Sequence, residues 1–344
     1  MNDVKSMLPA ELEQLLTALG EPKYRAKQLF SWLGRGAGSY AEMSNLPAAL
    51  REKLAKEAPL CPPEILRKAV SRTDGTVKYL WRLSDGNAVE TVVMRYAHGL
   101  TVCISSPVGC RMGCAFCAST IGGLVRNLTA GEMLDQVLFA RRDLGEEIGN
   151  IVVMGIGEPL DNYDNLLRFL TLANHPEGLN IGMRHITVST CGLTEKLAAL
   201  AAEDLQITLA ISLHAPDDET RSRLMPANRG RGVAAVLAAC EEYFARTGRR
   251  ITFEYAMIDG VNDSVSQAEQ LAALAKKARA HINLIPLNHV EEREFSPSAP
   301  ERMAAFCRVL DRLGANYTVR RSLGGDVDAS CGQLRRTYER GGSL

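Results

Sequence analysis

The chain has 344 residues, of which 46% are hydrophobic and 23% are charged, an ordinary globular composition. Lys plus Arg and Asp plus Glu number 40 each, so the net charge is zero and a generally basic nucleic-acid coat is excluded, although a local basic surface is not. No apolar run approaches the length of a membrane span, and the N-terminus lacks the pattern of a signal peptide. The nine unevenly spaced cysteines favour reduced thiols and a metal site over a disulfide framework, so we expect a cytoplasmic protein.

Residues 1–60 carry three short apolar patterns of helical period, which predict a small helical N-terminal domain. The turn at 19–27 joins the first two helices and resembles a helix-hairpin-helix nucleic-acid-binding module. Its basic side chains Lys23, Arg25 and Lys27 are candidate phosphate contacts. A solvated basic turn explains the same residues equally well.

Residues 61–98 change to a period of two, with Asp-Gly turns at Asp74-Gly75 and Asp85-Gly86. This pattern predicts a β-rich connecting region, a short antiparallel meander that continues into a strand at 100–105. From residue 99 to 344, strand-like runs alternate with helical patterns. The expected strands lie near 101–105, 150–154, 185–189, 206–212, 251–257, 281–285 and 316–320. Such alternation predicts a parallel sheet with helices outside it, and chemistry at the C-terminal ends of its strands.

The first of these strands leads into a loop with three cysteines, Cys110, Cys114 and Cys117, in a C-x3-C-x2-C spacing. Three thiolates can hold three irons of a [4Fe–4S] cluster and leave the fourth iron open for chemistry. A zinc loop is less favoured, because zinc usually takes four ligands in paired spacing and no second pair occurs here. The spacing, with Phe116 before the third cysteine, resembles the signature of the radical S-adenosylmethionine (SAM) superfamily. That resemblance implies a partial (β/α)6 barrel in which the open iron binds SAM.

Polar residues follow several of the expected strands, where a buried strand does not need them. The relevant positions are Gly157, Glu158, Ser189, Ser212, His214 and Asn288. Any one of them is explained by a turn, but several around one barrel mouth indicate a site. The segment that ends in Gly157-Glu158 resembles the superfamily's "GGE" segment, which implies that it binds the amino group of SAM.

The segments Ser-Ser-Pro-Val-Gly-Cys, Gly-Ile-Gly-Glu-Pro-Leu-Asp-Asn-Tyr, Thr-Val-Ser-Thr, Ser-Leu-His-Ala and Pro-Leu-Asn-His together resemble one family. It comprises the radical SAM methyltransferases that modify adenine C2 in 23S rRNA and, in some bacteria, in tRNA. The N-terminal turn and the segment Gly-Gly-Asp-Val-Asp-Ala-Ser-Cys-Gly-Gln-Leu extend the resemblance over nearly the whole chain. The resemblance implies a SAM site made by Gly157, Glu158, Ser189, Ser212, Leu213, His214 and Asn288.

The same resemblance gives roles to three residues that are otherwise unremarkable. Cys331 and Cys103 would ordinarily be core or loop thiols, and Glu90 an exposed strand residue. In the family pattern Cys331 carries the methyl group, Cys103 is the resolving thiol and Glu90 is the general base.

An electron-poor aromatic carbon such as adenine C2 cannot displace the methyl group of SAM directly, so the resemblance implies a radical route that uses two SAM molecules per turnover. Cys331 takes a methyl group from the first SAM, and reductive cleavage of the second gives a 5′-deoxyadenosyl radical. That radical removes a hydrogen from the S-methyl group, which then adds to C2 and forms a covalent RNA–protein intermediate. Glu90 removes the C2 proton, and a Cys103–Cys331 disulfide releases the product.

The RNA has to deliver one unstacked adenine into the barrel mouth. Candidate phosphate contacts near the C-terminus and around the barrel are Arg229, Arg231, Arg320, Arg321, Arg335 and Arg336. Each of these arginines is equally explained as a surface side chain that extends into solvent and contacts no RNA. The expected partners are 23S rRNA, with tRNA left open, and a flavodoxin- or ferredoxin-like electron donor for a monomeric enzyme.

Two alternatives remain at this stage, and a third is discounted. Methylation at adenine C8 shares every motif above. A non-catalytic iron–sulfur protein that binds RNA or senses redox state explains the cysteines but not the polar strand ends. Methylthiolation would need three further cysteines in an added N-terminal domain, and only Cys61 precedes Cys103.

Overall fold

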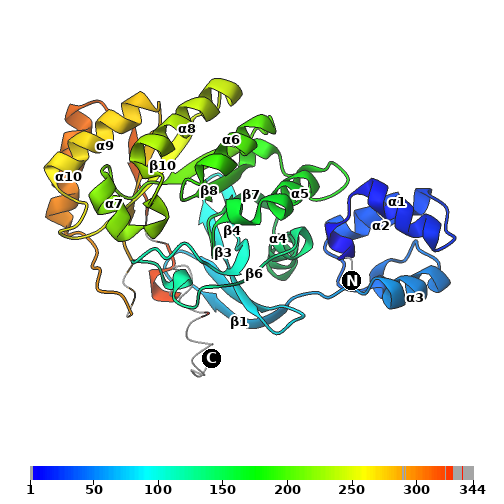
Figure 1. The fold of residues 1–344 in the computed structure, drawn as a ribbon. Coiled ribbons are helices and arrows are strands. Elements are labelled where there is room, and N and C mark those ends of the chain that lie inside the picture. Colours follow the sequence, from blue (N-terminus) through cyan, green and yellow to red (C-terminus); the bar gives the residue numbers. More distant parts are fainter. Residues whose placement is uncertain (1–2, 289, 291, 322, 328–334, 336–344) are drawn as a thin grey trace.

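The computed structural model describes residues 3–288, 290, 292–321, 323–327 and 335 (Figure 1). The α-helices of this part of the chain are α1 (Pro9–Ala18), α2 (Tyr24–Gly34), α3 (Ala48–Glu57), α4 (Ala130–Leu144), α5 (Tyr163–Asn174), α6 (Thr194–Ala202), α7 (Asp218–Leu224), α8 (Gly232–Thr247), α9 (Val265–Lys277) and α10 (Pro300–Arg312). The strands are β1 (Glu64–Val70), β2 (Val77–Arg82), β3 (Ala88–Tyr96), β4 (Gly99–Cys103), β5 (Pro107–Gly109), β6 (Leu124–Asn127), β7 (Ile148–Val153), β8 (Ile186–Thr190), β9 (Thr208–Ser212), β10 (Ile251–Met257), β11 (His281–Pro286) and β12 (Tyr317–Val319).

One large sheet organises the fold, in the strand order β1-β2-β3-β4-β7-β8-β9-β10-β11-β12. The strands from β1 to β4 pair antiparallel, and those from β4 to β12 pair parallel. The meander and the parallel strands expected from the sequence are both present, and β4 belongs to both. Among the described residues β1 and β12 do not pair with each other, so the sheet forms an open, partial barrel.

Helices cover the outer face of the barrel, where α6, α8, α9 and α10 follow one another around the parallel strands (Figure 1). Side chains at alternate strand positions, such as Val102, Ile151 and Val188, are buried in one continuous apolar core under this layer. The opposite face of the strands lines the interior of the barrel. This division is the reason that polar side chains inside the barrel can gather without entering the core.

Two elements near the predicted cysteine loop were not expected from the sequence. The short strands β5 and β6 form an antiparallel hairpin around the loop, and α7 lies between β9 and α8. A capping box at the start of α4 joins Thr129 and Glu132, and Glu132 also pairs with Arg126 of β6. The hairpin is therefore tied to the helix that follows it.

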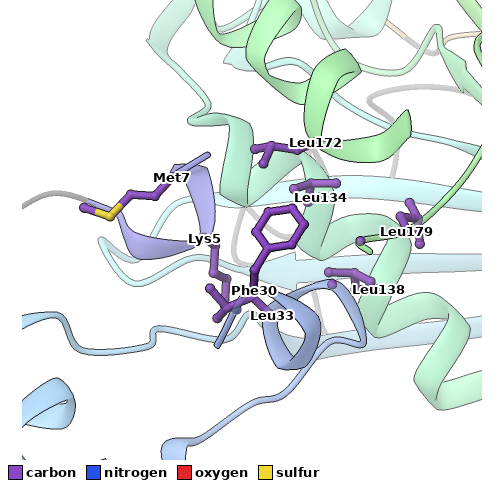
Figure 2. A pocket seen from close by; sticks show the side chains of 10 residues that line it. Lys5, Met7, Phe30, Leu33, Leu134, Leu138, Leu172 and Leu179 are labelled. Carbon is purple, nitrogen blue, oxygen red and sulfur yellow. The ribbon is translucent and has the colours of Figure 1, made fainter. Parts of the chain in front are cut away.

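The N-terminal helices α1–α3 form a separate group that lies beside α4 and α5 (Figure 1). Figure 2 shows Phe30 of α2 directed toward Leu134 and Leu138 of α4. A Cβ atom on Gly34 would lie 2.6 Å from the Cα atom of Gly178, so the two backbones are in contact there. This group is therefore docked on the barrel through a close-packed interface.

Polar contacts strengthen the same interface. Lys5 Nζ lies 2.8 Å from a carboxylate oxygen of Asp135, and both side chains are buried. Arg168 of α5 pairs with Glu11 of α1 at 2.5 Å. In the described part of the chain, every helix is too short or too polar to cross a membrane.

Candidate active site

The cysteine loop connects β5 to β6 and is closed at its base by backbone contacts. The Cys110 N–H donates to the carbonyl oxygen of Gly123 at 2.9 Å. Gly109 has φ +79°, and a Cβ atom there would lie 2.0 Å from the same Gly123 oxygen. Only glycine fits at this position, so the path of the chain into Cys110 is fixed.

The three thiols share one environment. Burial raises the pKa of Cys110 to about 12, and the neighbouring Cys117 and Glu158 raise it further. Burial also raises the pKa of Cys114, with added repulsion from Cys117 and Cys110, whereas Arg221 opposes this shift. The sulfurs are thus close enough to repel one another as thiolates, and a positively charged iron–sulfur core would relieve that repulsion. Among the described residues, no three His, Cys, Asp or Glu side chains are drawn together around one point as metal ligands.

A large cavity opens at the C-terminal ends of the parallel strands, beside the cysteine loop. It brings together four of the polar strand-end residues singled out in the sequence with one cysteine of the loop. These are Ser189, Ser212, His214, Asn288 and Cys117. The described residues that line the cavity do not include Gly157, Glu158 or Leu213.

His214 is held in one orientation at the end of β9. Its Nδ1 accepts a hydrogen bond from the Ala256 N–H at 3.0 Å, which places the ring proton on Nε2. Burial lowers the pKa of His214 to about 3, so the imidazole is neutral at physiological pH. Its ring meets Phe116 edge to face, with centroids 5.0 Å apart, and this contact joins the cysteine loop to β9.

Glu158 supports the strand ends from behind the cavity. Its carboxylate accepts hydrogen bonds from the Cys191 N–H at 2.7 Å and from the Leu160 N–H at 3.0 Å. Burial raises the pKa of Glu158, and these two hydrogen bonds oppose that shift. A Cβ atom on Gly157 would lie 2.0 Å from Pro107 Cγ, so this glycine lets the chain pass directly against β5.

Glu90 and Cys103 lie on the cavity face of the sheet. Cys103 of β4 pairs in register with Val92 of β3, and Val92 and Met94 line the cavity. Glu90, two positions before Val92, faces the same side of β3. Cys103 is buried in a small apolar cluster with Val92 and Met94.

Glu90 is not the exposed strand residue that its sequence context would suggest, because it is 3% exposed. Lys78 Nζ lies 3.1 Å from Glu90 Oε2, and Lys78 itself is fully buried. The backbone N–H of Arg335 donates to Glu90 Oε1 at 2.6 Å. Cys331 lies outside the described residues, but Arg335, four positions further along the chain, is in contact with Glu90.

Three buried charged residues around the site were missed from the sequence. Lys78 pairs with Glu90, Arg221 of α7 bridges the ends of β8 and β9, and Glu254 of β10 lines the cavity. Burial raises the pKa of Glu254, and Arg320 and a hydrogen bond from Asn283 oppose that shift. The available signal was a charged residue within an apolar strand, as in Phe253-Glu254-Tyr255.

The basic residues proposed to contact RNA divide into two groups. Arg320 and Arg321 line the cavity, and the backbone of Arg335 contacts Glu90, whereas Arg336 lies outside the described residues. In the N-terminal turn, Arg25 donates to Gln28 Oε1 at 2.9 Å and Lys27 pairs with Glu177. Arg231 lies 3.6 Å from Glu195, and Lys23 and Arg229 are exposed.

Comparison with known proteins agrees with this arrangement. Residues 104–275 match the family model described as the radical SAM superfamily. Residues 3–60 match the model described as the ribosomal RNA large subunit methyltransferase N-terminal domain.

Relatives match the chain over nearly its whole length. A probable dual-specificity RNA methyltransferase RlmN of Desulforamulus reducens is 51% identical, over 98% of this chain and 97% of the relative. The protein of the same description from Pelotomaculum thermopropionicum is 53% identical, over 97% and 91%. The crystal structure of a radical SAM methyltransferase from Sphaerobacter thermophilus superposes with a TM-score of 0.93 at 46% identity, over 97% of this chain and 99% of that one.

Proposed function

The chain belongs to the RlmN family of radical SAM methyltransferases, and we propose that it methylates C2 of an adenosine in 23S rRNA. The adenosine that follows the tRNA anticodon is a second substrate under this proposal, because the relatives are described as dual-specificity enzymes. Membership of the radical SAM superfamily implies a [4Fe–4S] cluster and SAM as cofactors.

The donor set fits such a cluster. Cys110, Cys114 and Cys117 are mutually repulsive as thiolates on one short loop, beside a cavity that can receive SAM. When bound, the cluster supplies the electron that cleaves SAM reductively. We assign the binding and orientation of SAM to the residues implied by the family pattern: Gly157, Glu158, Ser189, Ser212, Leu213, His214 and Asn288.

The neutral His214 suits this task. Its Nδ1 is occupied by the Ala256 N–H, so Nε2–H remains a donor toward a bound SAM molecule. Ser189 and Ser212, whose hydroxyl oxygens are 3.3 Å apart, offer adjacent donors and acceptors. Glu158 acts by holding the ends of β7 and β8 together through its bond to the Cys191 N–H.

The relay that we propose for the methyl group consists of Cys331, Glu90 of β3 and Cys103 of β4. Cys331 carries the group as a thioether and, after loss of a hydrogen atom, forms a bond to C2 of the adenine. Glu90 then takes the C2 proton, and the Cys103 thiol attacks the Cys331 sulfur, which breaks the bond from that sulfur to the methylene carbon, passes the thiol proton to the new methyl group, releases methylated RNA and leaves a disulfide. The unpaired electron of the adduct goes to a one-electron acceptor, a role that the oxidised cluster would fill. An external thiol or dithiol reductant restores the two thiols before the next turnover.

Two observations support this relay most strongly. Glu90 and Cys103 lie on the same face of the sheet as the cavity-lining Val92, and Glu90 accepts a hydrogen bond from the Arg335 N–H. Arg335 is four positions from Cys331 in the sequence, and its backbone N–H contacts the proposed base. The buried Lys78 Nζ, 3.1 Å from Glu90 Oε2, holds the carboxylate in place.

The proposal also assigns a role to each of three segments of the chain. We assign residues 1–60 to RNA binding, 61–98 to a connecting region and 99–344 to catalysis. Arg320 and Arg321 at the cavity mouth are suited to RNA phosphates. A flavodoxin- or ferredoxin-like protein as electron donor, a monomeric state and a cytoplasmic location complete the proposal.

The test is a Glu90→Gln variant with reconstituted cluster, incubated anaerobically with reductant, SAM and an unmodified 23S rRNA fragment. We expect RNA joined covalently to the protein to accumulate, seen as a slowly migrating band that persists in denaturant. Normal release of methyladenosine by Glu90→Gln would overturn the assignment of Glu90 as the base. Nucleoside mapping of the wild-type product then decides between C2 and C8, the second candidate, which shares the same motifs.

A further inference from the structure

Arg221 is a buried cation whose hydrogen bonds all go to neutral acceptors. It is 1% exposed, although it is an arginine in a seven-residue helix. Its guanidinium donates to the carbonyl oxygens of Cys191 at 2.6 Å, Leu213 at 3.1 Å and Ser212 at 3.3 Å. It also donates to Asn228 Oδ1 at 2.5 Å. The described residues place no carboxylate in an ion pair with it.

The carboxylate that does interact with Arg221 at longer range is Asp218. Asp218 is exposed, and it accepts hydrogen bonds from Asn228 and from the Val233 N–H. Water therefore screens its charge, and it compensates the buried guanidinium only weakly. Removal of a cation from water without a close counter-charge costs free energy. A residue of this kind indicates that a negative charge outside the polypeptide lies nearby.

The position of Arg221 shows where that charge lies. The helix that carries it also holds the cysteine loop, because the Ala115 N–H donates to the carbonyl oxygen of Leu224 at 2.8 Å. Cys114 and Leu224 belong to one apolar cluster. Arg221 and Cys114 are close enough for their charges to interact.

The same side chain fixes the strand ends next to the cavity. Cys191 follows β8, and its N–H is bound by Glu158 while its carbonyl oxygen is bound by Arg221. Ser212 and Leu213 lie at the end of β9, directly before His214. One guanidinium therefore joins the cysteine loop, through α7, to the two strand ends proposed to contact SAM.

We propose that Arg221 is the charge-compensating and positioning residue for the iron–sulfur cluster and its bound SAM. This inference rests on the proposed function, since it requires a cluster on Cys110, Cys114 and Cys117. Three thiolates give such a cluster a net negative charge, and reduction adds one more electron. A fixed cation beside Cys114 stabilises the reduced form more than the oxidised form, so it raises the reduction potential. The planar guanidinium of Arg221 donates several hydrogen bonds at once and so holds the ends of β8 and β9 together, which the ammonium group of a lysine cannot do.

The test compares three variants of the full chain after anaerobic cluster reconstitution. Arg221→Gln removes the buried charge, and Arg221→Lys keeps the charge but not the several hydrogen bonds of the guanidinium. The control, Arg223→Gln, removes an exposed charge from the same helix. The readouts are the midpoint potential of the cluster, followed by electron paramagnetic resonance, and the dissociation constant of SAM. Neither readout requires RNA or turnover.

We expect Arg221→Gln to shift the midpoint potential to a more negative value and Arg223→Gln to leave it unchanged. Arg221→Lys should keep the wild-type potential but weaken SAM binding by about tenfold, since it loses at least one hydrogen bond to the strand ends. A wild-type potential in Arg221→Gln with intact cluster would overturn the inference. So would a negative shift of the midpoint potential in Arg221→Lys relative to both the wild type and Arg223→Gln, and this comparison does not require Arg221→Gln to fold. Failure of the wild-type chain to bind a cluster would instead contradict the proposed function itself.

Discussion

At the scale of single residues, the pair of Lys78 and Glu90 is the most consequential contact in the site. Both side chains are buried, and the ammonium lies 3.1 Å from the carboxylate. Replacement of a charged group in a buried pair leaves its partner in a medium that penalises an isolated charge. Lys78 is therefore needed for the stability of the sheet.

We predict that Lys78→Met lowers the free energy of unfolding by about 3–5 kcal/mol, as measured by urea denaturation. The matched control is Lys68→Met on β1, because Lys68 forms a partly exposed pair with Asp143. That control should lose no more than about 1 kcal/mol. Equal losses in the two variants would show that burial of the Lys78–Glu90 pair has no special cost.

Gly157 supports a second prediction at this scale. Its φ is +97°, and an added Cβ atom would lie 2.0 Å from Pro107 Cγ, so Gly157→Ala must displace the strand that leads to Cys110. Gly86 has a similar φ of +85° with no atom within 4 Å of its added Cβ, so Gly86→Ala measures the conformational cost alone. We expect Gly86→Ala to lose about 1–2 kcal/mol of stability and Gly157→Ala a further 1–3 kcal/mol or so.

The iron content after reconstitution separates the two glycine variants further. Gly157→Ala should bind less iron than the wild type, because its strain falls on β5 next to the cysteine loop. Gly86→Ala, which lies in the turn between β2 and β3, should bind the wild-type amount. Full iron content in Gly157→Ala would contradict this account of the glycine.

The sequence indicated that polar residues following the parallel strands would share a cavity. The structure places four of them, Ser189, Ser212, His214 and Asn288, in one cavity. They gather there because the C-terminal ends of parallel strands lie at one edge. The buried state of Glu90 and the role of Lys78 could not be predicted, since both depend on the register of β2 and β3. In an alternating strand, a lysine or glutamate is expected to face water.

At the scale of elements, the contact between the N-terminal segment and α4 contains the buried carboxyl of Asp135, whose pKa is raised. Burial raises the pKa of Asp135 to about 6, and attraction to Lys5 only partly opposes this. A carboxyl whose pKa is higher in the folded than in the unfolded chain binds its proton more tightly in the folded state. Its contribution to stability is therefore present below about pH 4 and is lost as the pH rises through about 6.

We predict that the stability of the wild type relative to Asp135→Asn falls by about 3 kcal/mol between pH 4 and pH 7. Urea denaturation of both proteins across this range measures the difference. Asp143 is a control of opposite sign, because Lys68 and Tyr79 lower the pKa of its carboxyl despite partial burial. Relative to Asp143→Asn, the wild type should lose stability as the pH falls. A pH-independent difference for Asp135→Asn would contradict the prediction.

The long elements could be predicted from the sequence, and the short ones could not. The strands and helices of the barrel follow clear apolar periods, and the meander was indicated by its alternation and its Asp-Gly turns. The hairpin of β5 and β6 was missed because strands of three and four residues give no measurable period, and β5 begins with a proline and ends with a glycine. The seven-residue α7 was missed for the same reason, and its buried Arg221 breaks the expected polar face.

At the scale of the whole molecule, the N-terminal helices and the barrel are held in one arrangement by apolar and ionic contacts. Phe30 and Leu33 pack toward α4 (Figure 2). Arg142 pairs with Glu42 at 2.9 Å. A module that binds RNA through residues 19–27 would therefore stand at a fixed distance from the cavity. This arrangement favours an RNA substrate recognised by its folded shape together with one exposed adenine.

We propose that the methyl group passes through Cys331 as a methylene unit and is not transferred intact. The most direct test is anaerobic incubation of the reconstituted chain with reductant, an unmodified 23S rRNA fragment and SAM that carries a trideuterated methyl group. Nucleoside mass spectrometry then counts the deuterium atoms in the methyladenosine product. We expect two deuterium atoms to be retained in the new methyl group, because one is removed from the S-methyl group of Cys331. Retention of all three would mean direct transfer of the intact methyl group and would contradict the account.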